Sequence, residues 1–133
     1  MSDSPYGSPL ILVVDDHVDT VDSLAMVLRD TGYVVLEALD GKTALRLAGS
    51  HLPHVVLLDI AMPEMTGLEV AKGIRAIPGM KTALLITITG HGQPRDRQRS
   101  LEAGCDFHLV KPVDPNMLFS LLTKHLGAPK VGE

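Results

Sequence analysis

The chain has 133 residues, a formal net charge of −4 and 45% hydrophobic residues, which suits a single packed domain. The negative charge argues against nucleic-acid binding, the single cysteine excludes an internal disulfide framework, and no apolar run approaches the ~18 residues of a membrane helix. We therefore expect a cytoplasmic protein without membrane insertion, with a domain over 9–126 between flexible tails at 1–8 and 127–133.

Apolar runs and amphipathic segments alternate through the first half of the chain. They predict, in order, a strand over 10–14, a helix over 18–30, a strand over 34–38 and a helix over 41–48. The first strand is entirely apolar, as in a parallel strand that is covered on both faces. Glycines stand where the two helices are expected to end, at Gly32 and Gly49.

The second half of the chain continues the alternation. In order, it predicts a strand over 55–58, a helix over 66–77, a strand over 84–88, a helix over 94–103, a strand over 107–110 and a helix over 115–126. Thr66 and Glu69 have the spacing of a capping box, and Asp114 before Pro115 is typical of a helix start. This succession of strand–helix units predicts an α/β fold with a parallel five-stranded sheet and helices on both faces.

Polar residues fall where four of the predicted strands end. Asp15 and Asp16 follow the first strand, Asp59 follows the third, Thr89 closes the fourth and Lys111 follows the fifth. Because the carboxyl ends of the strands form the functional edge of an open α/β sheet, we expect these side chains to lie together. Each residue alone has an ordinary reading, as a turn or cap, a loop carboxylate, a strand threonine or a solvated lysine. Their joint placement favours a site.

Three neighbouring carboxylates repel one another unless a cation lies among them. Mg²⁺ fits this set because it prefers oxygen ligands and keeps several waters, whereas Ca²⁺ takes more protein oxygens. Lys111 adds a positive charge that can pair with a carboxylate or with a phosphoryl oxygen, and Thr89 adds a hydroxyl donor. No spacing typical of a metal site is found for His17, His51, His54 and His125.

Four segments together resemble the receiver domain of two-component response regulators and hybrid sensor histidine kinases, over about 9–126. They are ILVVDD at 11–16, VVLLDIAMPEMTGLE at 55–69, LLITITG at 84–90 and HLVKPVD at 108–114. The resemblance implies a flavodoxin-like, doubly wound fold with strand order 2-1-3-4-5. The HLVKP form is more similar to the receivers of hybrid kinases than to those of transcription regulators.

This resemblance assigns a role to each carboxylate. It implies that Asp59 is the phosphoacceptor, that Asp16 binds Mg²⁺ directly and that Asp15 binds it mostly through water. The backbone carbonyl of Ala61 would complete the ligands that the protein supplies.

The resemblance also implies which residues catalyse and switch. Thr89 resembles the hydroxyl that moves toward the phosphoryl group, and Lys111 resembles the ion-pairing lysine, with a cis peptide bond before Pro112. An aromatic switch residue usually stands three positions before this lysine, where the chain has His108. His108 either couples to Thr89 by hydrogen bonding or protonation or is an ordinary half-exposed strand histidine.

The function that the resemblance implies is that of a two-component phosphorelay receiver. Such a domain accepts a phosphoryl group from a phosphohistidine, on a sensor histidine kinase or a histidine phosphotransfer protein, in a Mg²⁺-dependent reaction. It then switches conformation at the face formed by 94–103, 107–110 and 115–126 and signals to a downstream effector protein or domain. It turns over no separate substrate, and no direct nucleic-acid binding is expected.

Three other readings remain to be compared with this one. A Mg²⁺-dependent aspartyl-phosphate phosphatase is the alternative, but that class has a DxDx(T/V) loop after the first strand, where this chain has DDHVDT, and a cap domain. A flavin- or nucleotide-binding module needs a loop rich in Gly, Ser or Thr at the same place, and two aspartates there would repel phosphate. A receiver with inactive chemistry is disfavoured because the acceptor, acidic pair, threonine and lysine are all present.

Overall fold

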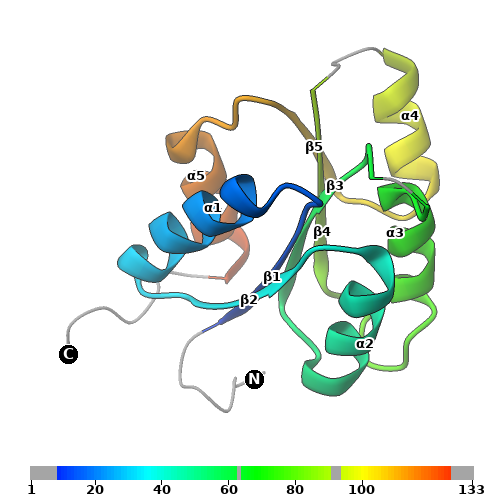
Figure 1. The fold of residues 1–133 in the computed structure, drawn as a ribbon, viewed down its shortest axis with the longest axis horizontal. Coiled ribbons are helices and arrows are strands. Elements are labelled where there is room, and N and C mark those ends of the chain that lie inside the picture. Colours follow the sequence, from blue (N-terminus) through cyan, green and yellow to red (C-terminus); the bar gives the residue numbers. More distant parts are fainter. Residues whose placement is uncertain (1–8, 63, 91–93, 127–133) are drawn as a thin grey trace.

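Five strands form one parallel sheet in the order β2-β1-β3-β4-β5, as the computed structural model of the chain shows (Figure 1). The structure describes residues 9–62, 64–90 and 94–126, so the expected tails at 1–8 and 127–133 lie outside the described residues. The elements are β1 Leu10–Val14, α1 Val18–Thr31, β2 Val34–Ala38, α2 Gly41–His51, β3 Val55–Asp59, α3 Gly67–Arg75, β4 Leu84–Thr89, α4 Pro94–Glu102, β5 Phe107–Val110 and α5 Pro115–Leu126. The fold class and the strand order expected from the sequence are thereby confirmed.

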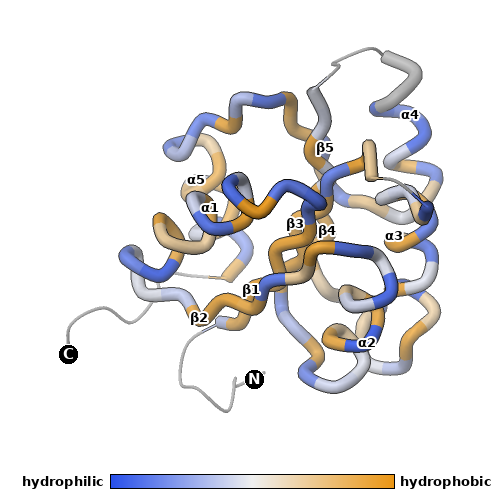
Figure 2. The backbone as a smooth tube through the Cα atoms, viewed as in Figure 1, coloured by the Kyte–Doolittle hydropathy of each residue, from blue (hydrophilic) through white to orange (hydrophobic). Residues whose placement is uncertain are grey.

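The helices cover the sheet on both faces and create two apolar cores. Helices α1 and α5 lie on one side, and α2, α3 and α4 lie on the other (Figure 1). Alternate residues of one strand enter different cores: Ile11 and Val13 pack with α1 and α5, whereas Leu12 and Val14 pack on the opposite face. Figure 2 accordingly shows hydrophobic residues concentrated along the strands. Burial on both faces explains why β1 contains no polar residue.

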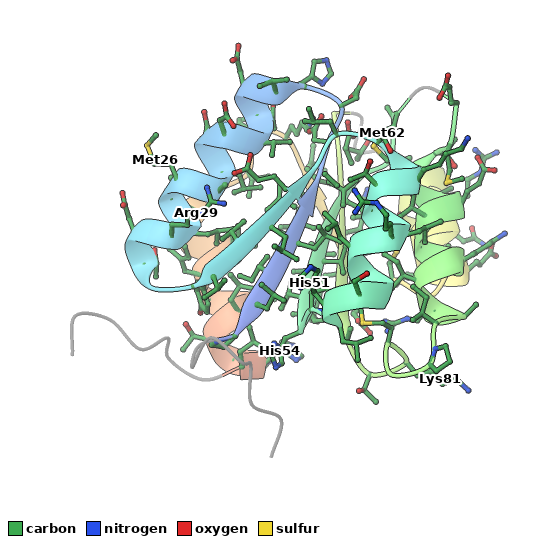
Figure 3. The ribbon with its side chains drawn as sticks, turned by 60° about the horizontal axis from the view of Figure 1, so that its bottom comes forward. Met26, Arg29, His51, His54, Met62 and Lys81 are labelled. Carbon is green, nitrogen blue, oxygen red and sulfur yellow. The ribbon has the colours of Figure 1, made fainter. Side chains whose placement is uncertain are left out.

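Outward-facing side chains of the helices are partly apolar as well. Met26 on α1 points away from the sheet and is 63% exposed, and Arg29 lies one turn further along the same helix (Figure 3). Among the described residues, none of the helices combines the length and apolar character that crossing a membrane requires.

The expected end of α2 is wrong by about one turn. Gly49 lies inside the helix, which continues to His51 and ends at Leu52 in a left-handed conformation with φ 49°. Gly49 does not have a positive φ, so its backbone does not mark a helix end. The helix instead ends where Pro53 would have to join it, because proline lacks the N–H of a helical hydrogen bond. The end expected for α1 is confirmed, with Gly32 as a left-handed C-cap.

Arg75 links several segments at the end of the sheet where the strands begin, opposite to their carboxyl ends. Its Nε donates to the Gly104 carbonyl at 2.9 Å, its Nη1 donates to the Ala83 carbonyl at 2.8 Å, and its Nη2 donates to Asp106 Oδ2 at 2.9 Å. The same Asp106 oxygen accepts from the backbone N–H of Leu85 at 2.9 Å. One guanidinium therefore joins the end of α3 to β4 and to the segment between α4 and β5.

Candidate functional site

Three aspartates come together at the carboxyl ends of β1 and β3. Val14 and Leu58 are register partners in the parallel sheet, so the next residues, Asp15 and Asp59, leave neighbouring strands at the same level. One side-chain atom from each of Asp15, Asp16, His17 and Asp59 lies within 4.8 Å of the others. Asp15 and Asp59 are only 3% and 4% exposed. The structure thus brings together the carboxylates that the sequence placed at strand ends, with Asp59 as the last residue of β3 rather than the first residue after it.

Lys111 reaches this group from the far side of β4. Its Nζ lies 3.0 Å from Asp15 Oδ2 and 3.7 Å from Asp59 Oδ2. The backbone N–H of Lys111 donates to the Thr89 carbonyl at 2.7 Å, which fixes the start of the segment that follows β5. The peptide bond between Lys111 and Pro112 is cis. The ammonium group is therefore held between two buried carboxylates.

Burial and the neighbouring charges move the pKa values of the two carboxyls in opposite directions. Burial raises the pKa of Asp59, and the charge of Asp15 raises it further, against the opposing effects of the Ala61 N–H and Lys111. Burial would also raise the pKa of Asp15, but the His17 N–H and the Lys111 ammonium outweigh it and hold that pKa below its usual value. Burial would lower the pKa of Lys111, but its hydrogen bond to Asp15 and the charge of Asp59 raise it. Without a further cation, the site therefore favours charge on Asp15 over charge on Asp59.

The donor set fits a divalent cation. Asp16 Oδ1 is buried and has no hydrogen-bond partner among the described residues, although it lies 3.2 Å from His17 Nδ1. Three carboxylates face one lysine, so the cluster has excess negative charge that a cation would offset. Ala61 lies beside this group, because its backbone N–H donates to Asp59 Oδ1 at 3.2 Å. The residues present can accordingly hold a metal ion through oxygen atoms.

His17 is the member of the cluster that sequence reasoning missed. It precedes α1 at the N-cap position, but its side chain makes no capping hydrogen bond. Its Nδ1 lies 3.1 Å from Asp15 Oδ1, and its backbone N–H donates to the same oxygen at 2.9 Å. The hydrogen bond to Asp15 and the charge of Asp16 raise the pKa of His17. The available signal was its position directly after the Asp15–Asp16 pair, rather than any spacing to another histidine.

Thr89 lies on β4, which pairs with β3, and His108 lies on β5, which pairs with β4 at the edge of the sheet. Thr89 is the last residue of β4, is 3% exposed, and follows Ile88, the register partner of Asp59. His108 on β5 is the register partner of Thr87, and its Nδ1 lies 2.9 Å from Thr87 Oγ1 and 3.1 Å from Ser100 Oγ on α4. The hydrogen bonds of this ring thus join β4, β5 and α4.

A cavity of about 690 Å³ opens beside the cluster, between α1 and α5. Its walls are mainly apolar and include Leu24, Leu118 and Phe119, and Asp59 and Lys111 lie among the residues that line it. The Asp59 carboxylate therefore borders an open space, although little of its own surface is exposed.

The chain is similar in sequence and in structure to several known proteins. It is 41% identical over 115 residues to an uncharacterized 14.6 kDa protein of Leptolyngbya boryana. This alignment covers 86% of this chain and 88% of that protein. It is 38% identical over 103 residues to the transcriptional regulatory protein KdpE of Mycobacterium tuberculosis, covering 77% of this chain but only 44% of KdpE. The chemotaxis protein CheY4 of Vibrio cholerae matches the structure with a TM-score of 0.84 and 32% identity, over 89% of this chain and 98% of CheY4.

The family model of the response regulator receiver domain matches residues 11–123. This match covers both cores and all the grouped residues at the carboxyl edge of the sheet. The chain belongs to the response regulator receiver domain family.

Proposed function

We propose that the chain is a phosphorelay receiver that accepts a phosphoryl group on Asp59 from a phosphohistidine, with Mg²⁺ bound beside it. The donor is a sensor histidine kinase or a histidine phosphotransfer protein, and the reaction takes place in the cytoplasm. The observation that carries this proposal is the buried Asp59 carboxylate between Lys111 and two further aspartates, at the edge of an open cavity.

The chemistry follows from the charges around Asp59. One Asp59 oxygen attacks the phosphorus atom as the bond to the donor imidazole nitrogen breaks, and the nitrogen keeps the electron pair and takes up a proton. The product is an acyl phosphate, which water later hydrolyses to return the carboxylate. Held by Asp15, Asp16, Asp59 and the carbonyl of Ala61, Mg²⁺ would supply positive charge to the phosphoryl oxygens.

Lys111 and Thr89 are proposed to act on the same phosphoryl group. The Lys111 ammonium is 3.7 Å from Asp59 Oδ2, so it is placed to donate to an oxygen of the group that Asp59 receives. Thr89 ends the neighbouring strand and offers a hydroxyl donor from β4. No separate substrate is turned over in this scheme, because the protein itself is the phosphoryl acceptor.

The output is proposed to pass through the face formed by α4, β5 and α5. The hydrogen bond from the Lys111 N–H to the Thr89 carbonyl connects the phosphoacceptor edge to the end of β5. The contacts of His108 with Thr87 and Ser100 extend that connection to α4, which supports a switch role for His108. A downstream effector protein or domain would read the changed face.

Phosphorylation by a small donor tests the proposal directly. The chain is incubated with acetyl phosphate and Mg²⁺, and intact mass reports the gain of one phosphoryl group. Asp59→Asn should abolish the gain, whereas Asp30→Asn, an exposed aspartate at the end of α1, should not alter it. Full incorporation in the Asp59→Asn variant would overturn the assignment of the acceptor.

A further inference from the structure

The side chain of His17 lies over the carboxylates of the cluster. Its Nδ1 is 3.1 Å from Asp15 Oδ1 and 3.2 Å from Asp16 Oδ1, and it belongs to the set whose ligand atoms lie within 4.8 Å of one another. The ring has 67% of its surface exposed, so packing does not force it into this position. The three carboxylates are therefore joined by one nitrogen donor.

The nitrogen changes which ions the cluster suits. Mg²⁺ prefers oxygen ligands and keeps much of its water, so an imidazole adds little to its binding. Zn²⁺ and Ni²⁺ accept imidazole nitrogen readily, and Zn²⁺ is commonly held by a mixture of histidine and carboxylate ligands. The same four side chains thus offer an oxygen site to one class of cation and a mixed nitrogen and oxygen site to another.

We propose that His17 is a metal ligand that allows Zn²⁺ to occupy the divalent cation site of this receiver and to compete there with Mg²⁺. The inference rests on the proposed function, since it concerns the same site. Asp16 Oδ1 supports it, because that oxygen is buried, accepts no hydrogen bond within the described chain and lies 3.2 Å from His17 Nδ1. A cation between these two residues would be bound by Asp16 Oδ1 and by His17 Nδ1.

Binding measurements on the unphosphorylated chain test the inference without any activity assay. Zn²⁺ and Mg²⁺ are titrated separately by calorimetry into the wild type, into His17→Asn and into the control His125→Asn on α5. Asparagine is a favourable N-cap residue, so α1 is retained, and it replaces the ring nitrogen by an amide. We expect His17→Asn to weaken Zn²⁺ binding at least tenfold and to change Mg²⁺ binding less than twofold, with no change for either ion in the control.

The imidazole that binds Zn²⁺ is identified by ¹⁵N NMR of the histidine rings, since the chain has six histidines. The His17 ring signals should shift at one equivalent of Zn²⁺, and added Mg²⁺ should reverse the shift. Shifts confined to other histidines, unchanged Zn²⁺ affinity in His17→Asn, or an equal loss of both ions would each overturn the inference. Failure of the proposed function is separate, because it would appear as full phosphoryl incorporation in Asp59→Asn, which the Zn²⁺ titrations do not measure.

Discussion

The ammonium of Lys111 donates to Asp15 Oδ2 at 3.0 Å, across a sequence separation of 96 residues. Its distance to Asp59 Oδ2 is 3.7 Å, so its closer contact is with the carboxylate that follows β1 and not with the proposed acceptor. A phosphoryl group on Asp59 would bring new oxygens within reach of the lysine. Lys111 is thus placed to exchange the Asp15 carboxylate for an oxygen of the phosphoryl group.

Replacing Lys111 by alanine should separate metal binding from switching. We expect Lys111→Ala to retain Mg²⁺, because no ligand oxygen is removed, and to reduce the spectral change that acetyl phosphate or beryllofluoride produces. The free energy of unfolding should fall by about 1–2 kcal/mol, because buried Asp15 loses its partner while the lysine itself was partly exposed. Mg²⁺ titration, NMR spectra and urea denaturation measure the three effects. Lys124→Ala on α5 is the control, and unchanged activation in Lys111→Ala would refute its role.

Removing the charge of Asp59 should stabilise the metal-free chain at neutral pH. The pKa of Asp59 is raised in the folded state, so the folded chain binds this proton more tightly than the unfolded chain does. Stability from this group is therefore present at low pH and is lost as pH rises through the raised pKa. We expect Asp59→Asn to increase the free energy of unfolding at pH 7 by on the order of 1 kcal/mol.

The difference between Asp59→Asn and the wild type should shrink in two conditions. Mg²⁺ offsets the repulsion in the wild type, and acid protonates Asp59 itself. Urea denaturation with and without Mg²⁺, across a pH series, measures both. A variant that is less stable than the wild type at neutral pH without metal would contradict the electrostatic argument.

Gly67 and Gly49 should respond oppositely to alanine. A Cβ on Gly67 would collide with the Asp59 carbonyl oxygen and lie 2.8 Å from Ile60 Cα, and backbone atoms cannot move aside cheaply. We expect Gly67→Ala to lower stability by about 1–3 kcal/mol and to slow phosphorylation by displacing Asp59. Gly49→Ala meets nothing and should gain about 0.5–1 kcal/mol from helix propensity. Thermal denaturation measures the change in stability of each variant. Equal effects at the two positions would show that the close approach of Gly67 to Asp59 is unimportant.

Arg75 should contribute far more to the free energy of unfolding than an ordinary surface arginine does. Its guanidinium donates hydrogen bonds to four carbonyls and to Asp106, and truncation removes the donor that these acceptors share. We expect Arg75→Ala to cost about 2–4 kcal/mol. Arg29→Ala, which breaks a more exposed pair with Glu37, should cost under about 1 kcal/mol. Similar urea midpoints for the two variants would argue against this role.

The sequence was sufficient to predict the sheet and the position of its acidic edge. Strands buried on both faces have a clear apolar signature, and parallel pairing then brings Asp15 and Asp59 side by side. The contacts of Arg75 and His108 were beyond this reasoning, because they depend on how three separate elements approach one another. His17 was missed for a related reason, because its contacts with Asp15 and Asp16 depend on the orientation of its ring. The end of α2 was misplaced because glycine marks a helix end only where the backbone needs a left-handed residue.

The hydrogen bonds of Arg75 also determine how α4 can move. Gly104, just beyond the last turn of α4, is tied through its carbonyl to the end of α3, while Ser100 contacts His108 on β5. A rearrangement at the phosphoacceptor edge should therefore tilt α4 about its C-terminal end and not translate it as a whole. In hydrogen exchange, beryllofluoride should alter the amides of 97–100 and leave those of 103–105 unchanged; uniform changes along the helix would exclude such a pivot.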